Sequence, residues 1–263
     1  MAKAEVTAAL QRSPRLYGLA RSRWWLAGVR QAIPWLRNYS LPGVLGVLRR
    51  FGLRYKRGRR YLHSPDLAYA EKLARVAAAW AQVQADPQRY VLVYEDELSY
   101  YRRPSVGYGY DQACGDHLRA DQGLHGNRRM RIAGSLDVRT GGFFAWQRRC
   151  FDRITLLRYF QALAAAYPAA ACIYVALDNW PVHFHPELVA ALADCRIELL
   201  SLPTYAPWTN PTEKVWHLLY RQVLHLHDFV DRWPELQSEV GRFLDQYANP
   251  SPELLRYTGL LTD

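Results

Sequence analysis

Residues 90–97 read YVLVYEDE, a run of β-branched and aromatic residues that ends in three acids. Such a run is typical of a buried strand. A second run, ACIYVALDN at residues 171–179, has the same character and also ends in an acid. Between them, residues 130–149 predict a hairpin that turns at Thr140-Gly141-Gly142. These segments predict a sheet in which two buried strands carry acids at their ends.

The rest of this region alternates helices and strands. Apolar periodicity predicts helices at residues 154–167, 186–194 and 211–224, and a further strand at residues 196–203. The order is strand, strand pair, helix, strand, helix, strand, helix. This order predicts an α/β fold with a mixed sheet flanked by helices, occupying residues 89–263.

Residues 1–62 have a different pattern, which predicts a small helical module of the winged helix-turn-helix kind. A helix over residues 20–33 is interrupted by Pro34, and Ser40 is a good N-cap for a second helix over residues 41–51. Gly52 is expected to end that helix, and a basic hairpin or extended arm follows it.

Residues 63–88 predict a helical linker between the two modules. Ser64 and Pro65 are its expected N-cap and first residue, and Leu67 and Trp80 are among its expected inward positions.

The positive charge is concentrated in the first module. Residues 1–60 contain fourteen Lys and Arg and one acid, whereas the remainder contains twenty bases and twenty-three acids. This asymmetry indicates a module that binds a polyanion, with a solvated basic tail as the alternative. A helix of this module can enter the major groove of DNA while basic side chains contact phosphates. The candidate DNA-contacting residues are Arg21, Arg23, Arg49, Arg50, Arg54, Lys56, Arg57, Arg59 and Arg60.

Composition argues against several other classes of protein. The sequence has no apolar run of about 18 residues and no apolar stretch near Met1, so neither a membrane span nor a secretory signal is expected. A cytoplasmic location is the default expectation. The four cysteines include no C-x-x-C pair, so a zinc site is unsupported.

Three acids are candidates for chemistry by their positions. Asp96 and Asp178 lie at the ends of buried strands, and Glu213 lies at the start of a helix. Carboxylates that converge beyond strand ends can hold two Mg²⁺ ions, and such a pair of ions supports phosphodiester displacement. Each acid also has a structural interpretation. Glu213 fits a capping box that begins at Asn210, Asp178 fits a turn, and part of the cluster around Asp96 can simply face solvent.

Three segments in order strengthen the chemical interpretation: VLVYEDELSYYRRP at residues 91–104, VALDNWPVHFHP at residues 175–186, and LPTYAPWTNPTEKVW at residues 202–216. Together they resemble the mariner-like superfamily of DDE transposases, and more closely its bacterial insertion-sequence branch of the IS-six-thirty type. Thirty-four residues lie between Asp178 and Glu213, as is typical of that superfamily. Members often carry two helix-turn-helix units, whereas one can be read here.

The resemblance implies an RNase H-like catalytic domain with Asp96, Asp178 and Glu213 as catalytic residues and metal ligands. It selects Asp96 because the first aspartate of the family stands in an Asp-Glu pair. It also implies two Mg²⁺ ions, with Mn²⁺ expected to substitute. The expected partners are double-stranded DNA, as terminal inverted repeats and TA-containing target, and a second copy of the chain on that DNA. A bacterial enzyme of this kind is nucleoid-associated when bound to DNA.

Secondary candidates surround the three acids: Glu97, Asn179, His183, His185, Asn210 and Lys214. For the two histidines, packing beneath the turn is favoured over contact with DNA or metal. Lys214 can meet phosphate or lie on a solvated face. Two rival functions remain: a DNA-binding regulator or domesticated remnant without activity, and a nuclease that cuts without joining.

Overall fold

The computed structural model describes residues 1–56, 63–111 and 116–261. The chain divides into two compact units, Met1–Tyr61 and Leu62–Asp263. Arg57, Arg59 and Arg60, three of the candidate DNA contacts, lie outside the described residues. None of the described helices is long and apolar enough to cross a membrane.

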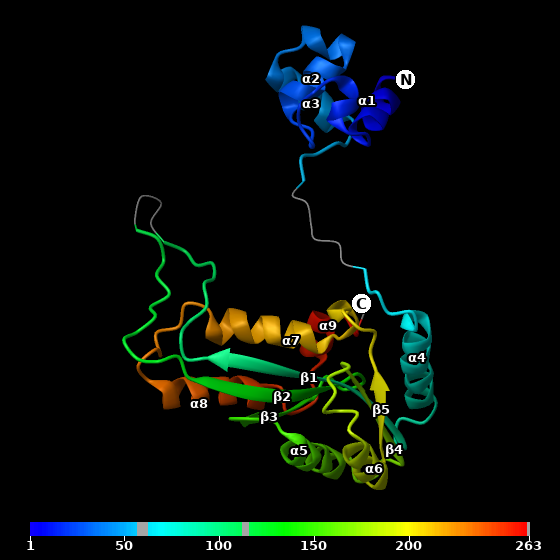
Figure 1. The fold of residues 1–263 in the computed structure, drawn as a ribbon, viewed down its shortest axis with the longest axis vertical. Coiled ribbons are helices and arrows are strands. Elements are labelled where there is room, and N and C mark those ends of the chain that lie inside the picture. Colours follow the sequence, from blue (N-terminus) through cyan, green and yellow to red (C-terminus); the bar gives the residue numbers. More distant parts are fainter. Residues whose placement is uncertain (57–62, 112–115, 262–263) are drawn as a thin grey trace. The chain divides into compact units, whose positions relative to one another are not determined.

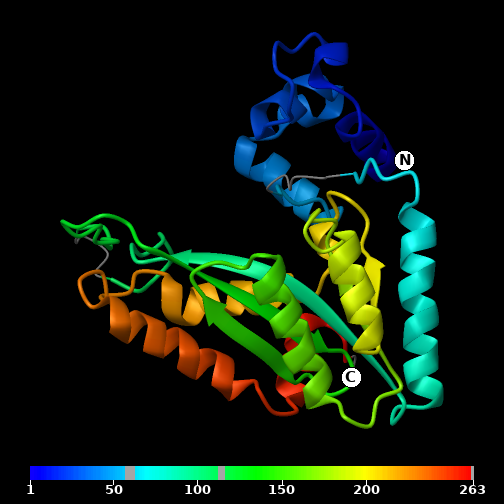
Figure 2. The same cartoon turned by 60° about the horizontal axis from the view of Figure 1, so that its bottom comes forward.

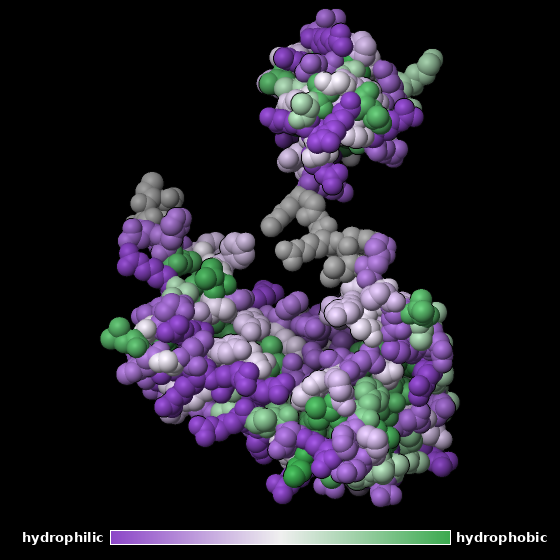
Figure 3. Space-filling view, viewed as in Figure 1, coloured by the Kyte–Doolittle hydropathy of each residue, from purple (hydrophilic) through white to green (hydrophobic). Residues whose placement is uncertain are grey.

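The first unit is helical. It contains α1 (Ala2–Leu10), η1 (Pro14–Tyr17), α2 (Leu26–Ala32), η2 (Pro34–Asn38) and α3 (Leu41–Arg50). Its core is formed by apolar side chains of all three α-helices, including Val6, Val29 and Val44. Ser40 caps α3 as predicted, since its Oγ accepts from the Gly43 N–H at 3.2 Å. Many hydrophilic side chains surround smaller apolar patches on its visible surface (Figure 3).

The helix predicted over residues 20–33 is shorter in the structure and begins only at Leu26. Two aromatic contacts explain the difference. The Trp24 indole N–H donates to the Arg12 carbonyl at 2.8 Å, and the Trp25 ring lies directly over Gly28, where a Cβ atom would come within 2.7 Å of the ring. These contacts hold residues 24 and 25 outside the helix. The described residues that follow Gly52 have no regular structure up to Lys56.

The second unit contains a five-stranded mixed sheet in the order β3-β2-β1-β4-β5 (Figure 1). Its strands are β1 (Tyr90–Tyr101), β2 (Arg129–Asp137), β3 (Phe143–Arg148), β4 (Cys172–Leu177) and β5 (Ile197–Ser201). β1, β2 and β3 pair antiparallel, whereas β1, β4 and β5 pair parallel. The hairpin predicted around Thr140 is the β2–β3 pair.

Helices cover both faces of this sheet (Figures 1 and 2). α5 (Arg153–Ala166) and α6 (Pro186–Asp194) pack on the face that carries Val93 of β1. The other face carries Leu92 and Tyr100 and is covered by α4 (Tyr69–Ala85), α7 (Thr212–Leu219), α8 (Trp233–Gln246) and α9 (Pro252–Thr258). The short elements η3 (Pro207–Thr209) and η4 (Tyr220–Leu224) flank α7. Successive residues of β1 therefore point to different helical layers.

The helical linker starts later than predicted, at Tyr69 rather than Pro65. Long-range hydrogen bonds compete with the helix here. Ser64 Oγ donates to the Thr204 carbonyl at 2.6 Å, and Asp66 Oδ2 accepts from the Thr204 N–H at 2.9 Å. Leu67, predicted to face inward, is fully exposed because it lies in this turn before the helix.

Candidate active site

A cavity of about 450 Å³ opens at one end of the sheet and is lined by Asp96, Asp178 and Glu213. Asp96 comes from β1, Asp178 directly follows β4, and Glu213 lies in the first turn of α7. The remaining lining is formed by Asn179, Trp180, Leu202, Pro203, Thr204, Tyr205, Ala206, Pro207 and Asn210. The three candidate acids thus face one shared space, although they are far apart in the sequence.

Asp96 does not end its strand, contrary to the sequence-based expectation. β1 continues to Tyr101 because it pairs with β2 from Val93 onward. β4 is the shorter strand and ends at Leu177, so β1 runs past it. Since Tyr94 pairs with Ala176, Asp96 and Asp178 lie at the same level of two neighbouring chain segments.

Asp96 is largely buried, and its carboxylate is held by two donors. The Trp216 indole N–H donates to Oδ2 at 2.9 Å, and the Glu97 backbone N–H donates to Oδ1 at 2.9 Å. Burial raises the pKa of Asp96 to about 7, with the negative charge of Glu213 as the next contribution. Burial also raises the pKa of Glu213. Negative charge in this cavity is therefore poorly compensated by the protein.

Two side chains fasten the start of α7 to β1 and so place Glu213. Thr212 Oγ1 donates to the Tyr94 carbonyl at 3.0 Å, and Asn210 Nδ2 donates to the Glu95 carbonyl at 2.9 Å. Asn210 Oδ1 accepts from the Thr212 N–H at 3.1 Å, rather than from the Glu213 N–H that a capping box requires. The Glu213 carboxylate faces the cavity, while Asn210 serves as the anchor.

Asp178 is more exposed than Asp96 and lies in a turn. Its Oδ1 accepts from the Trp180 N–H at 2.9 Å, which is the turn that the sequence offered as an alternative. The same oxygen lies 3.4 Å from His183 Nδ1. The contact with His183 is the largest contribution to a lowered pKa of Asp178. Asp178 therefore both forms the turn and lines the cavity.

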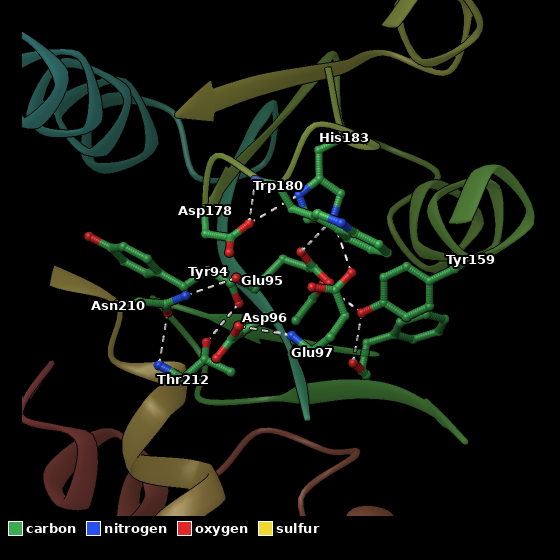
Figure 4. A network of polar contacts seen from close by, with 12 residues as sticks. Tyr94, Glu95, Asp96, Glu97, Tyr159, Asp178, Trp180, His183, Asn210 and Thr212 are labelled. Atoms are coloured by element: carbon green, nitrogen blue, oxygen red, sulfur yellow. Dashed lines mark hydrogen bonds and ion pairs between the residues drawn. The ribbon is translucent and has the colours of Figure 1, made fainter. Parts of the chain in front are cut away.

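The other two acids of the cluster, Glu95 and Glu97, occupy the opposite face of β1, together with His183 (Figure 4). His183 Nε2 lies 3.0 Å from Glu97 Oε1 and 4.0 Å from Glu95 Oε2. Burial lowers the pKa of His183, but the bonds to Asp178 and Glu97 outweigh it and raise that pKa to about 10. Burial, followed by the charge of Glu97, raises the pKa of Glu95 well above its usual range.

The remaining secondary candidates differ in whether they line the cavity. Asn179 lines the cavity and donates from Nδ2 to the Leu202 carbonyl at 2.6 Å. His185 is exposed and lies 3.4 Å from an Arg153 nitrogen, and it does not line the cavity. Lys214 Nζ donates to the Thr258 carbonyl at 2.6 Å, at the end of α9. These contacts favour a structural role for Lys214.

Two residues that hold the site escaped the sequence analysis. Trp216 is buried in the core, and no sequence pattern signals its bond to Asp96. Thr212 carried no signal beyond its place before Glu213. The neighbouring Trp208, by contrast, is 51% exposed, and its indole N–H donates to the Tyr69 hydroxyl.

Several described DNA-contact candidates gather in the first unit. Arg21 and Arg23 line a surface cavity of about 370 Å³ there, and the Arg21 guanidinium stacks over the Trp25 ring at 4.4 Å. Arg49 and Arg50 lie in the last turn of α3. Arg54 and Lys56 are exposed in the segment that follows.

Comparison with known proteins gives concordant matches. The family profile described as "DDE superfamily endonuclease" matches residues 91–237. An "Insertion element IS630 uncharacterized 39 kDa protein" from Shigella sonnei is 25% identical over 248 residues, covering 92% of this chain and 70% of the relative. Among solved structures, the Mos1 transposase paired-end complex with the left transposon end has a TM-score of 0.62 at 15% identity, covering 98% of this chain and 74% of that one. The Mos1 mariner paired-end complex with Mn has a TM-score of 0.58 at 16% identity, covering 97% and 74%. At these identities the structural matches show a shared fold.

Proposed function

The chain belongs to the DDE superfamily endonucleases, and we propose that it is a transposase that cuts DNA at the ends of a mobile element and joins those ends to target DNA. The predicted resemblance to mariner-like DDE transposases and the predicted RNase H-like fold are confirmed by these matches. The observation that carries the proposal is the single cavity lined by Asp96, Asp178 and Glu213.

The donor set of this cavity fits divalent metal ions. Three carboxylates supply the hard oxygen ligands that Mg²⁺ prefers, and Mn²⁺ accepts the same ligands. Burial raises the pKa of Asp96 and of Glu213, and a bound cation would offset the cost of ionising these carboxylates. We assign Asp96, Asp178 and Glu213 as the ligands of two such ions. When bound, the ions would activate an attacking oxygen and stabilise the leaving oxygen of a phosphodiester.

The protein's own contribution is to hold its carboxylates in place. Trp216 fixes one oxygen of Asp96, and the Thr212 bond to the Tyr94 carbonyl fixes the start of the Glu213 helix against the strand of Asp96. A water would first attack a phosphodiester at the element end. The bond between phosphorus and the 3′-oxygen would break, which leaves a 3′-hydroxyl on the element. That hydroxyl would then displace a 3′-oxygen in the target strand. No covalent bond to the protein is required in either step.

The first unit is proposed as the module that binds the terminal inverted repeats, in the helix-turn-helix manner that its sequence predicts. Its basic charge and its exposed arginines support this role. By family resemblance, the target contains TA and the active species is a homodimer that holds two ends. Bound to DNA, such a protein would be associated with the nucleoid.

The test is cleavage and joining of labelled element ends by the full chain with Mg²⁺. Asp96→Ala, Asp178→Ala, Asp178→Asn and Glu213→Ala are each expected to abolish both reactions and to leave DNA binding nearly unchanged. Asp194→Asn, which changes an exposed acid outside the cavity, is the matched control. Near-normal cutting by a variant of the three acids would disprove the site. Cut but unjoined ends from the wild-type chain would instead support the rival nuclease function, and DNA binding without either reaction would support the regulator.

A further inference from the structure

A buried group of three side chains lies behind the cavity, on the opposite face of β1 (Figure 4). Glu95 and Glu97 are two residues apart on a strand, so both turn to this face, where they meet His183. None of the three side chains is more than 7% exposed. Among the described residues, no hydrogen-bond donor reaches either carboxylate oxygen of Glu95. His183 therefore faces two buried carboxyl groups.

His183 also reaches the cavity side, because its two ring nitrogens face different acids. Nε2 lies 3.0 Å from Glu97, and Nδ1 lies 3.4 Å from the Asp178 carboxylate. The ring therefore spans the two acids, with one nitrogen beside each carboxylate. The ring thus links Asp178 to the residue that follows Asp96 in β1.

Asp178 depends on such a link more than Asp96 does. Asp96 lies within a paired strand, whereas Asp178 lies beyond the last residue of β4 and its side chain is 61% exposed. Its carboxylate is contacted by the Trp180 N–H of the same turn and by His183. Of these two contacts, only His183 connects it to β1, through Glu97.

We propose that His183, held by Glu97, is a positioning residue that sets the Asp178 carboxylate relative to Asp96 for binding of divalent metal. The inference rests on the proposed function, since it takes Asp96 and Asp178 as ligands. Carboxylates that orient a metal ligand from behind typically change metal affinity or activity 10–100-fold when they are lost, and an effect of the same size is expected of an orienting histidine.

The test is Mn²⁺ binding to the full chain, measured by electron paramagnetic resonance without DNA, so that the readout is independent of activity. In His183→Gln the amide nitrogen replaces Nε2, which keeps the Glu97 contact and loses the Asp178 contact. In His183→Asn it replaces Nδ1 and does the reverse. We expect both variants to bind Mn²⁺ about tenfold more weakly than wild type, because each breaks one half of the link between Glu97 and Asp178.

Two further variants separate positioning from folding. Glu97→Gln is expected to weaken Mn²⁺ binding as His183→Gln does, and the double variant is expected to be no weaker than either single, because both break one link. His227→Gln is the matched control, since His227 is a buried histidine outside the cavity lining. Its Mn²⁺ affinity should equal that of the wild type.

Three results would overturn the proposal. The first is Mn²⁺ affinity within twofold of wild type in a folded His183→Gln chain, and the second is independent effects of Glu97→Gln and His183→Gln in the double variant. The third is a triple variant, Asp96→Asn/Asp178→Asn/Glu213→Gln, that still binds Mn²⁺ and loses it when His183→Gln is added. The last would make the buried group itself a metal site. The proposed function fails on a different result, namely wild-type Mn²⁺ binding and cleavage that persist without the three acids.

Discussion

Asp96→Asn is expected to make the metal-free protein more stable while abolishing its activity. Burial and the charge of Glu213 raise the pKa of Asp96 to about 7, against 3.8 for an unperturbed aspartate. The folded chain therefore holds a proton that the unfolded chain has lost, so stability falls as pH rises from about 4 to 7 and stays lowered above 7. A shift of about 3 pKa units corresponds to roughly 4 kcal/mol above pH 7, and to roughly 2 kcal/mol at pH 5.5.

The asparagine removes this penalty but introduces a cost. The two Asp96 oxygens accept from Trp216 and from the Glu97 N–H, and an amide has one acceptor oxygen. Placing its NH₂ against one of these donors costs about 1–2 kcal/mol. The net gain is then about 2–3 kcal/mol at pH 8 and near zero at pH 5.5.

Thermal unfolding in EDTA measures this difference. A gain of about 2–3 kcal/mol raises the midpoint by roughly 5–10 °C for a unit of this size. Mg²⁺ should stabilise the wild type more than the variant, since it neutralises the same charge. Asp194→Asn, at an exposed acid, should leave the midpoint unchanged at both pH values. An Asp96→Asn chain no more stable than wild type at pH 8, or a gain equal at both pH values, would refute the reasoning.

Three other predictions concern the anchor of α7, the packing of the first unit and the division of charge between the two units. Thr212→Val removes the donor to the buried Tyr94 carbonyl, so it should lower stability by about 1–3 kcal/mol in urea titrations and weaken cleavage more than DNA binding. Gly28→Ala would place a Cβ atom 2.7 Å from the Trp25 ring. Overpacking of this kind should lower the stability of the first unit by about 1–3 kcal/mol, and it should weaken DNA binding without changing Mn²⁺ affinity. Removing residues 1–62 should abolish most DNA affinity, and the affinity of the full chain should fall steeply in salt titrations, by roughly 0.9 log unit per log unit of salt for each neutralised phosphate; tight binding by residues 63–263 alone would contradict the modular arrangement.

Local patterns foretold the parts of the molecule that depend on neighbouring residues. The β2–β3 hairpin and the Ser40 cap of α3 formed where turn and cap residues predicted them. Runs of β-branched and aromatic residues predicted the central strands. Such features are readable because their energetics involve residues only a few positions apart.

The errors in β1 and α4 share a cause, which is long-range contact. β1 extends beyond its predicted end because β2, which is distant in sequence, continues to pair with it. α4 starts late because Ser64 and Asp66 bond to Thr204. His183 was expected to pack beneath a turn, which it does, but its contact with Glu97 becomes visible only once β1 and β4 are adjacent. No local pattern encodes these pairings.

The consecutive acids Glu95, Asp96 and Glu97 give β1 an unusual tolerance of error. A one-residue slip of a strand exchanges its two faces. In most strands an insertion or deletion would replace the functional group by an unrelated side chain, but here a glutamate would take the place of Asp96. The cavity would keep its negative charge, while the carboxylate would extend one methylene further and Asp96 would face His183. A slip of this strand would thus keep the charge of the cavity but change the length of the side chain that carries it. Selection on this segment would therefore act on the difference in length between aspartate and glutamate.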